Sequence, residues 1–396
     1  MTAPPKPIEL EEAWERLLGP VEALPAETFP VEACLGRYLA EDLIARRTQP
    51  PCDLSAMDGY AVRVDDLVGP WTVIGESAAG HPFAGELSRG EAIRISTGAH
   101  MPSGEMALLL QENAAREADA LSLNVEGDPT PRHIRRAGHD FAEGQALLSR
   151  GVPIGAAQIA LALGAGHAKL AVHALPSLAI IDSGDELVSD PESCAPHQIP
   201  ATNGAMLVAM AAPHCRKIVR LGPVADSLND LLNALDQASE ADVIVTSGGA
   251  SVGDHDLVKP ALEQWGAEID FWRVAIKPGK PLMVGRKGTQ IILGLPGNPG
   301  SAYVTAFLFL LPLLRRIAGS GQPLPKAVSA TAGCDIGQGG QRREFLRSEY
   351  SGGVAHPFGS QDSGGLLSLA SANALVERPA NAVAVANGEG VPVYIL

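Results

Sequence analysis

The sequence predicts a multidomain protein built around a doubly wound, mostly parallel α/β sheet, with a β-rich insert, a helical segment and a C-terminal domain resembling a β-barrel. Apolar strand-like runs alternate with helix-length segments between residues 178 and 317, which indicates a parallel sheet covered on both faces. Elsewhere, Gly and Pro separate short strand-like pieces, which is typical of small β domains. The length of 396 residues also predicts more than one domain.

The N-terminal part combines helical patterns with an inserted β region. Ile8–Leu18 alternates apolar and acidic residues at helical spacing, Val31–Leu39 gives a second short pattern, and Ile154–Leu163 gives a third. The strand-like pieces between them are Trp71–Ile74, Ala92–Ile95, Leu108–Gln111 and Leu121–Val125. We therefore predict a helical linking domain in two segments, 1–47 and 139–174, around an inserted β domain at 48–138.

The central region has the clearest alternation. The predicted strands are Leu178–Ile181, Lys217–Leu221, Val243–Val245 and Ile291–Leu295. The predicted helices are Gly204–Ala212, Ser227–Ala238, Leu257–Trp265 and Ser301–Ile317. These elements predict an α/β domain at 175–320, and the Gly-rich, strand-like texture that follows predicts a C-terminal β domain at 321–396.

Composition restricts the classes of partner and the compartment. The net charge of −15 argues against nucleic acid or an anionic membrane as the main partner, although local clusters of Arg and Lys allow small anionic ligands. The five scattered cysteines form no C-x-x-C pair, so neither a zinc site nor a disulfide framework is indicated. No basic segment followed by an apolar one begins the chain, and Ala302–Leu314 is shorter than a bilayer span of about 20 residues. We expect a cytoplasmic protein.

A Gly-rich loop follows the predicted strand Val243–Val245. It contains Ser247, Gly248, Gly249 and Ser251, so its backbone can turn tightly and direct N–H and hydroxyl groups at an anion. In an open parallel sheet, ligands bind outside the carboxyl ends of the strands, where this loop lies. An ordinary strand-to-helix loop is the alternative interpretation.

Two further segments favour an anionic ligand. Pro296-Gly297-Asn298-Pro299-Gly300-Ser301 follows another strand and opens a helix, whose free N–H groups attract phosphate. Lys277 and Lys280 lie three residues apart in a loop stiffened by prolines, a pattern that fits an oxyanion clamp, although surface lysines are commonly only solvated.

Carboxylates follow the same predicted strand ends. Glu186, Asp226 and Asp256 would face a phosphate ligand, an arrangement typical of Mg²⁺, which binds few carboxylates together with phosphate oxygens. A helix N-cap is the alternative role, above all for Asp226.

Taken together, the motifs resemble one family. They are S-A-M-D-G-Y-A at 55–61, S-T-G-A at 96–99, R-R-A-G-H-D at 135–140, S-G-D-E-L at 183–187, T-S-G-G-A-S-V-G-D-H-D at 246–256, F-W-R-V-A-I-K-P-G-K-P at 271–281, L-P-G-N-P-G-S at 295–301, R-R-E-F-L-R at 342–347 and G-S-Q-D-S at 359–363. In this order they resemble the molybdopterin molybdenumtransferases, the MoeA or gephyrin E-domain family.

The resemblance implies a reaction and an assembly. The α/β domain would be the molybdopterin-binding domain, and adenylylated molybdopterin with molybdate would give molybdenum cofactor and AMP, with Mg²⁺ or a similar divalent cation required. It implies a homodimer with the β insert of one chain facing the α/β domain of the other. Transient contacts with the molybdopterin adenylyltransferase and with molybdoenzyme maturation proteins would follow.

The resemblance also implies residue roles. Catalytic roles fall to Asp58, Thr97, Arg135, Asp140, Glu186, Asp226, Asp256, Lys277 and Lys280, of which the first four would come from the partner subunit. Glu186, Asp226 and Asp256 would hold the cation. Substrate and oxyanion binding fall to Ser247, Gly248, Gly249, Ser251, Arg273, Pro296, Gly297, Asn298, Pro299, Ser301, Arg342 and Ser363.

Some positions depart from the family pattern, and other functions stay open. Arg273 stands where Lys is common, Asp182 where Ser or Thr is common, and His139 where Glu is common. One alternative is a molybdopterin adenylyltransferase, which uses a related α/β domain. The other is a non-catalytic paralogue that carries the cofactor or serves as a scaffold.

Overall fold

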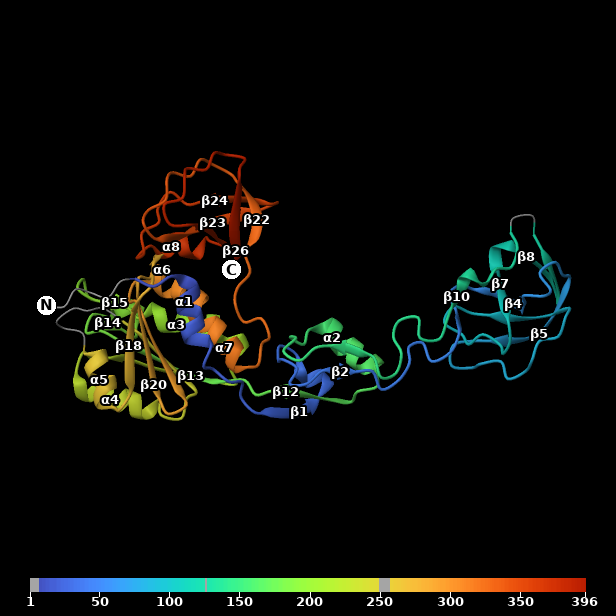
Figure 1. Cartoon of the computed structure of the whole chain (residues 1–396), viewed down its shortest axis with the longest axis horizontal. Helices are drawn as coiled ribbons and strands as arrows, with labels where there is room; N and C mark the ends of the chain where they lie inside the picture. Colours follow the sequence, from blue (N-terminus) through green and yellow to red (C-terminus); the bar gives the residue numbers. More distant parts are fainter. Residues whose placement is uncertain (1–6, 125–126, 249–256) are drawn as a thin grey trace.

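The protein is described here by a computed structural model covering residues 7–124, 127–248 and 257–396. The chain is elongated: the α/β and C-terminal domains lie at one end, the β insert lies at the other, and a narrow linking segment joins them (Figure 1). Separate clusters of buried apolar side chains lie in each part, so no single core holds the chain together.

The sheet of the α/β domain has six strands in the order β16-β13-β17-β21-β20-β18. The four parallel strands are β16 (Lys217–Val224), β13 (Ser177–Ser183), β17 (Val243–Ser247) and β21 (Gln290–Leu295). Two antiparallel strands complete one edge, β20 (Pro281–Lys287) and β18 (Glu268–Arg273). The predicted mostly parallel sheet is therefore confirmed, with two strands that apolar runs alone did not indicate.

Helices cover both faces of this sheet, as a doubly wound fold requires. Along β13, Leu178 and Ile180 face one core, whereas Ala179 and Ile181 face the other, because successive strand side chains point to opposite sides. The first face carries α1 (Leu10–Leu18), α3 (Thr202–Ala211), α6 (Pro299–Thr305) and α7 (Leu311–Ile317). The second carries α4 (Leu228–Gln237) and α5 (Val258–Gln264).

Helix α1 lies against the α/β domain, although the sequence pattern grouped residues 1–47 with the linking segment. Leu10, Ala13 and Leu17 are at most 1% exposed in the same core as α7. The indole Nε1 of Trp14 donates to the carbonyl oxygen of Leu308 at 2.7 Å. The apolar stripe of α1 is thus buried by a surface almost 300 residues away along the chain, which periodicity cannot specify.

A π-helical turn, Ala306–Leu310, joins α6 to α7. The continuous run Pro299–Ile317 is, within the described ranges, the one helix long and apolar enough to cross a membrane, but 83% of its most apolar window is buried. It is a core helix of the α/β domain, as the pattern of Ala302–Leu314 predicted.

The linking segment is built from short antiparallel pairs and one helix. β1 (Ala26–Pro30) pairs with β12 (Lys169–His173), β2 (Leu43–Ile44) pairs with β11 (Ala146–Leu148), and α2 (Ala156–Gly164) packs beside them. The helical pattern predicted at Val31–Leu39 forms only a 3₁₀ turn at Val31–Cys34, because Gly36 follows in a left-handed conformation.

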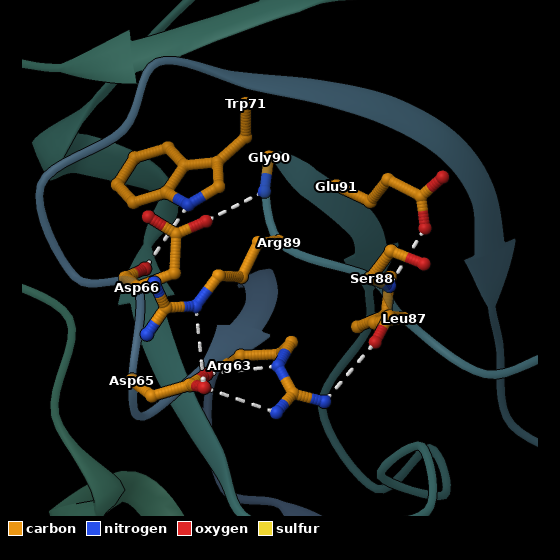
Figure 2. A network of polar contacts seen from close by, with 9 residues as sticks. All are labelled: Arg63, Asp65, Asp66, Trp71, Leu87, Ser88, Arg89, Gly90 and Glu91. Carbon is orange, nitrogen blue, oxygen red and sulfur yellow. Dashed lines mark hydrogen bonds and ion pairs between the residues drawn. The ribbon is translucent and has the colours of Figure 1, made fainter.

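The insert is a six-stranded sheet in the order β7-β4-β6-β5-β9-β8. Its strands are β4 (Gly59–Arg63), β5 (Trp71–Ser77), β6 (Glu91–Ile95), β7 (Met106–Leu110), β8 (Ala114–Glu117) and β9 (Ala120–Leu123). Figure 2 shows the polar network beyond the carboxyl end of β4, where the Arg63 and Arg89 guanidinium groups both contact Asp65. These ion pairs hold the pKa of Asp65 at about 2, chiefly through the Arg63 hydrogen bond. The network lies beyond the end of β4 that is opposite Asp58.

The C-terminal domain is a closed five-stranded barrel, which confirms the β-barrel prediction. Its strands are β22 (Val328–Ala332), β23 (Arg343–Ser351), β24 (Val354–Pro357), β25 (Ala374–Arg378) and β26 (Gly390–Ile395). Closure comes from the additional pairing of β23 with β25. A two-residue strand of the α/β domain, β19 (Ile276–Lys277), adds in parallel to β23 and ties the two domains together.

The burial of α1 predicts that Leu17→Ala destabilises the α/β domain by about 2–5 kcal/mol, because a fully buried leucine leaves a cavity when truncated. Urea unfolding followed by tryptophan fluorescence measures the shift. Glu15→Ala, on the exposed face of the same helix, is the control and should change stability by less than about 0.5 kcal/mol. Equal effects of the two variants would contradict the packing described for α1.

Candidate functional site

A cavity of about 560 Å³ opens at the carboxyl ends of β13, β17 and β21. This is the edge at which parallel α/β sheets bind ligands. Eight of the residues predicted from the sequence line it: Glu186, Asp226, Ser247, Gly248, Pro296, Gly297, Asn298 and Pro299. The loops that follow separate strands therefore form one site.

The Gly-rich loop begins where β17 ends. Ser247 is 3% exposed, and Gly248 has a φ of +98°, a conformation that side chains rarely adopt. A side-chain carbon at Gly248 would lie 2.9 Å from the carbonyl oxygen of Ser183 on the neighbouring strand. Glycine thus lets the loop turn closely against β13. The predicted residues Gly249, Ser251 and Asp256 lie outside the described residues.

Asn203, in the first turn of α3, joins the two loops that the sequence predicts to bind phosphate. Its Nδ2 donates to Ser247 Oγ at 2.9 Å and to the Gly297 carbonyl oxygen at 2.6 Å. Its Oδ1 is buried and, in the described structure, has no hydrogen-bond partner, although the residue lines the cavity. An unpaired buried acceptor is costly unless a ligand donates to it. Sequence reasoning missed Asn203, because no spacing rule relates an Asn to loops 44 and 94 residues away.

Asp182, which lines the cavity, helps to fix the start of α3. Its carboxylate is 1% exposed and accepts a hydrogen bond from Arg220 Nε at 3.0 Å, while Arg220 Nη2 donates to the carbonyl oxygen of Ala201 at 2.6 Å. Burial raises the pKa of Asp182, with Arg220 and the Gly204 N–H acting in the opposite direction. A side chain at Gly204 would clash with this carboxylate. Asp182 stands where Ser or Thr is common in the family, and its buried carboxylate is paired with Arg220.

Three carboxylates gather on the acidic rim of the cavity, which we define as Asp185, Glu186 and Asp226. The backbone N–H of Asp226 donates to Asp185 Oδ1 at 2.9 Å. Burial raises the pKa of Asp226, and the negative charges of Asp185 and Glu186 raise it further. No group of three or more His, Cys, Asp or Glu side chains with metal-binding geometry occurs among the described residues. The rim is therefore a concentration of negative charge rather than a preformed cage.

The loop that carries Lys277 and Lys280, which we call the lysine loop, lies against both α6 and the barrel. Lys277 Nζ contacts Glu344 Oε1 at 2.8 Å, and the guanidinium of Arg342 donates to the carbonyl oxygen of Ile276 at 3.1 Å. A side-chain carbon at Gly279 would lie 2.7 Å from Thr305 Oγ1 and 3.8 Å from the Ser301 carbonyl oxygen. Lys277, Arg342 and Ser301 thus come from three distant segments to one place, with Lys277 already paired to a carboxylate.

A loop of the barrel and the lysine loop both reach the cavity wall. Asn298 Nδ2 donates to Ser363 Oγ at 3.1 Å, so Ser363 of the barrel meets a residue that lines the cavity. Lys280 precedes Pro281, which also lines the cavity, and Arg273 pairs with Pro281 across β18 and β20. Among the described residues, no contact places the side chain of Lys280 or Arg273 in the cavity wall.

The predicted residues of the insert lie away from this cavity in the same chain, since Figure 1 places the insert at the opposite end of the molecule. Asp58 and Thr97 are exposed, and Asp58 Oδ1 accepts from the Thr97 backbone N–H at 2.7 Å and from its hydroxyl at 3.1 Å. The Thr97 N–H lowers the pKa of Asp58. Arg135, on β10 (Ile134–Arg135), and Asp140 are exposed as well.

Family models match nearly the whole chain. Residues 8–166 match the MoeA N-terminal region (domain I and II), residues 179–316 match a probable molybdopterin binding domain, and residues 329–396 match the MoeA C-terminal region (domain IV). The three matches follow the order of the linking segment and insert, the α/β domain and the barrel.

Relatives agree with these matches over most of their length. The chain is 34% identical over 352 residues to the molybdopterin molybdenumtransferase of Haemophilus influenzae, covering 87% of this chain and 86% of that protein. It is 33% identical over 384 residues to molybdopterin molybdenumtransferase 2 of Mycobacterium tuberculosis, covering 93% and 95%. The crystal structure of the molybdopterin biosynthesis moeA protein from Pyrococcus horikoshii superposes with a TM-score of 0.84 at 27% identity, over 99% of this chain and all of that one. The motifs, the domain order and these relatives together establish that the chain belongs to the MoeA family of molybdopterin molybdenumtransferases.

Proposed function

We propose that this chain inserts molybdenum in molybdenum-cofactor biosynthesis, converting adenylylated molybdopterin and molybdate into molybdenum cofactor and AMP. One observation carries the proposal: the cavity is lined by the loops predicted to bind phosphate, and Asn298 in its wall contacts Ser363 of the barrel, the domain that also brings Arg342 against the backbone of Ile276, next to Lys277. A phosphate ester and a second, tetrahedral oxyanion could therefore be held side by side.

The phosphate side consists of Ser247, Asn203 and the start of α6. Because Ser247 Oγ accepts from Asn203, its own hydroxyl hydrogen is free to donate to a phosphate oxygen. Asn298 precedes the first helical residue, Pro299, and the N–H groups of a helix start favour an anion there. These groups fit the phosphate linkage of an adenylylated pterin.

The acidic rim fits a divalent cation. Mg²⁺ keeps several waters and binds through one or two carboxylates plus substrate phosphates, so Glu186 and Asp226 suffice without a closed cage. The raised pKa of Asp226 reflects burial and the charges of Asp185 and Glu186, which a cation would offset. When bound, the cation would supply charge neutralisation for the phosphate linkage. Asp256, expected as a third ligand, lies outside the described residues.

The oxyanion side consists of Lys277, Lys280, Ser301, Arg342 and Ser363. Fixed cationic donors match a tetrahedral dianion such as molybdate. The pairing of Lys277 with Glu344 is half-exposed on the lysine side, so Lys277 can exchange this partner for an oxyanion at little cost.

A second copy of the chain would complete the site. Asp58, Thr97 and Arg135 are exposed polar residues that the elongated chain keeps away from its own cavity. The linking segment exposes apolar surface, with Leu35 65% and Leu163 44% exposed, which a homodimer could cover. Closed twofold dimers are the commonest assemblies of identical chains.

The family matches on both sides of the α/β domain favour insertion over adenylylation, since an adenylyltransferase needs little more than that domain. Five free cysteines in the described structure are in keeping with a reducing, cytoplasmic setting. In that setting the adenylyltransferase would supply the substrate and molybdoenzyme maturation proteins would take the product.

The reaction is tested by supplying adenylylated molybdopterin, Mg²⁺ and increasing molybdate to the purified protein and measuring AMP by chromatography. We expect AMP release that depends on molybdate. Formation of adenylylated product from molybdopterin and ATP would instead identify an adenylyltransferase. Binding of molybdopterin with no release of AMP would identify a carrier.

The acidic rim predicts that Asp226→Asn slows AMP release by roughly tenfold or more at limiting Mg²⁺, because a ligand charge is lost. Asp230→Asn, which changes an exposed carboxylate in the first turn of α4, is the matched control and should leave the rate unchanged. A wild-type rate and wild-type Mg²⁺ dependence for Asp226→Asn would remove Asp226 from the cation site.

The bridge made by Asn203 predicts that Asn203→Ala weakens AMP binding by roughly tenfold, since two hydrogen bonds between the loops are lost. Isothermal titration calorimetry with AMP measures the change. Asn233→Ala, at an exposed position of α4, should bind AMP like the wild type. Unchanged binding by Asn203→Ala would show that the loops keep their positions without the bridge.

The shared site predicts complementation between inactive variants. Asp58→Ala changes the insert and Asp226→Ala changes the α/β domain, so a mixed dimer retains one intact site. Co-expression should restore roughly a quarter of wild-type activity, because half the dimers are mixed and each has one of two sites intact. Asp226→Ala with Lys277→Ala, both in the α/β half, should restore none. Equal activity of the two mixtures would contradict a site built from two chains.

A further inference from the structure

The start of α3 forms one wall of the cavity but has no cap of its own. Ala201, Thr202 and Asn203 line the cavity. The helix begins after Ala201, whose methyl side chain cannot accept a hydrogen bond from the free N–H groups of the first turn. The carboxylate of Asp182, on β13, accepts from the N–H of Gly204, the third residue of α3. Asp182 thus does from another element what an N-cap side chain does within a helix.

Arg220 holds the residue that precedes this helix. It lies on β16, in register with Ile180 of β13. Its Nε donates to Asp182 Oδ2 at 3.0 Å, and its Nη2 donates to the Ala201 carbonyl oxygen at 2.6 Å. The Ala201 N–H in turn donates to the Val188 carbonyl oxygen at 2.9 Å. Both polar groups of the Ala201 backbone are therefore held in place.

Gly204 is fitted closely to Asp182 and Arg220. A side-chain carbon at Gly204 would lie 1.9 Å from Asp182 Oδ2 and 2.6 Å from Arg220 Nε. The hydroxyl of a Ser or Thr, which is common at position 182 in the family, would offer Arg220 no negative charge. Carboxylate, guanidinium and glycine therefore form one closely packed arrangement at the start of α3.

The Asp182 carboxylate is a buried charge in the wall of a site that is proposed to bind an anion. It is 1% exposed, and the carboxylates of the acidic rim, Asp185, Glu186 and Asp226, lie at the same cavity. Within the described part of the chain, Arg220 is the ion-pair partner of Asp182. Removing one member of a buried pair leaves the other charge uncompensated. Without Arg220, this wall would add a further negative charge where a phosphate is to bind.

Asn203 lies between the two backbone groups that the pair anchors, the Ala201 carbonyl oxygen and the Gly204 N–H. Its side chain joins Ser247 to the backbone of Gly297. The first turn of α3 cannot shift without breaking its contacts with Asp182 and Arg220. The pair therefore sets the position from which Asn203 reaches both loops.

We propose that Asp182 and Arg220 are positioning residues for nucleotide binding: they anchor the first turn of α3, hold Asn203 between the two loops, and keep this wall of the cavity electrically neutral. This role rests on the proposed function, which places the phosphate linkage of the nucleotide in the cavity. The pair acts on nucleotide affinity through Asn203. The molybdate side, built from the lysine loop and the barrel, does not depend on it.

The test removes the cation with Arg220→Met, the negative charge with Asp182→Asn, and both in the double variant. Arg216→Met is the matched control, because Arg216 Nη2 pairs with Asp242 at 3.4 Å at the amino ends of the same parallel strands, away from the cavity. Four properties of each full-length variant are measured: AMP affinity by calorimetry, the molybdate concentration for half-maximal AMP release, melting temperature, and hydrogen exchange of the peptide 199–206.

We expect Arg220→Met to weaken AMP binding by roughly tenfold or more. Asp182→Asn should weaken it by roughly threefold, because the amide oxygen still accepts from the Gly204 N–H. The double variant should bind AMP more tightly than Arg220→Met, since no uncompensated carboxylate remains. Exchange of 199–206 should become faster in all three, with half-maximal molybdate within about twofold of wild type. Arg216→Met should change neither AMP affinity nor this exchange.

Arg220→Lys carries the test if Arg220→Met does not fold. Lysine keeps the charge beside Asp182 but has no fork with which to hold the Ala201 carbonyl oxygen as well. AMP binding should weaken by roughly threefold, again with little change in molybdate dependence.

Unchanged AMP affinity in a folded Arg220 variant would overturn the role of the pair. A double variant that binds AMP no better than Arg220→Met would overturn it too, and so would losses of AMP and molybdate affinity that follow melting temperature in Arg220→Met and Arg216→Met alike. A wild-type protein that binds no AMP would instead overturn the proposed function, and the nucleotide role of Asp182 and Arg220 with it.

Discussion

Burial of the central parallel strands on both faces is the constraint on which the rest of this structure depends. The alternate side chains of β13 and β17 enter two separate cores, so helices must cover both faces, and the connections between the parallel strands must cross over. The carboxyl ends of β13, β17 and β21 then open at one edge. Ser247, Asn298 and the acidic rim meet there because the sheet leaves their loops no other place.

The barrel depends on the same edge. β19 leaves the α/β domain and adds to β23, which brings Arg342 beside the lysine loop and places the loop containing Ser363 against α6. A closed barrel has no free edges, so it offers a rigid support for these contacts. The proposed oxyanion side is therefore an interdomain contact, stabilised by the pairing of β19 with β23 and by the hydrogen bond from the Gly300 N–H to the Ser363 carbonyl oxygen. The insert is stabilised separately, by its own two clusters of buried apolar side chains, and presents Asp58 and Thr97 at its surface.

Much of the site could be predicted from the sequence, because its chemistry lies in short contiguous motifs. Gly248 is needed for a turn with positive φ, and prolines at the start of α6 leave its N–H groups free; both are local requirements that a sequence records directly. The four parallel strands were likewise predictable, since burial on both faces demands continuous apolar runs. Asn203 was not predictable as a site residue. It acts through contacts with segments far away in the chain, and nothing in its immediate neighbours distinguishes it from a surface Asn.

The sequence by itself determined the α/β class, the order of the domains and the Gly- and Pro-rich loops at the strand ends, because these follow from residue type and local spacing. The tertiary structure decided which segments meet. It assigned α1 to the core of the α/β domain, added β20 and β18 to its sheet, and brought Ser363 to the start of α6. The reason is physical: periodicity specifies that a face will be buried, whereas the partner that buries it is selected by packing across the whole chain.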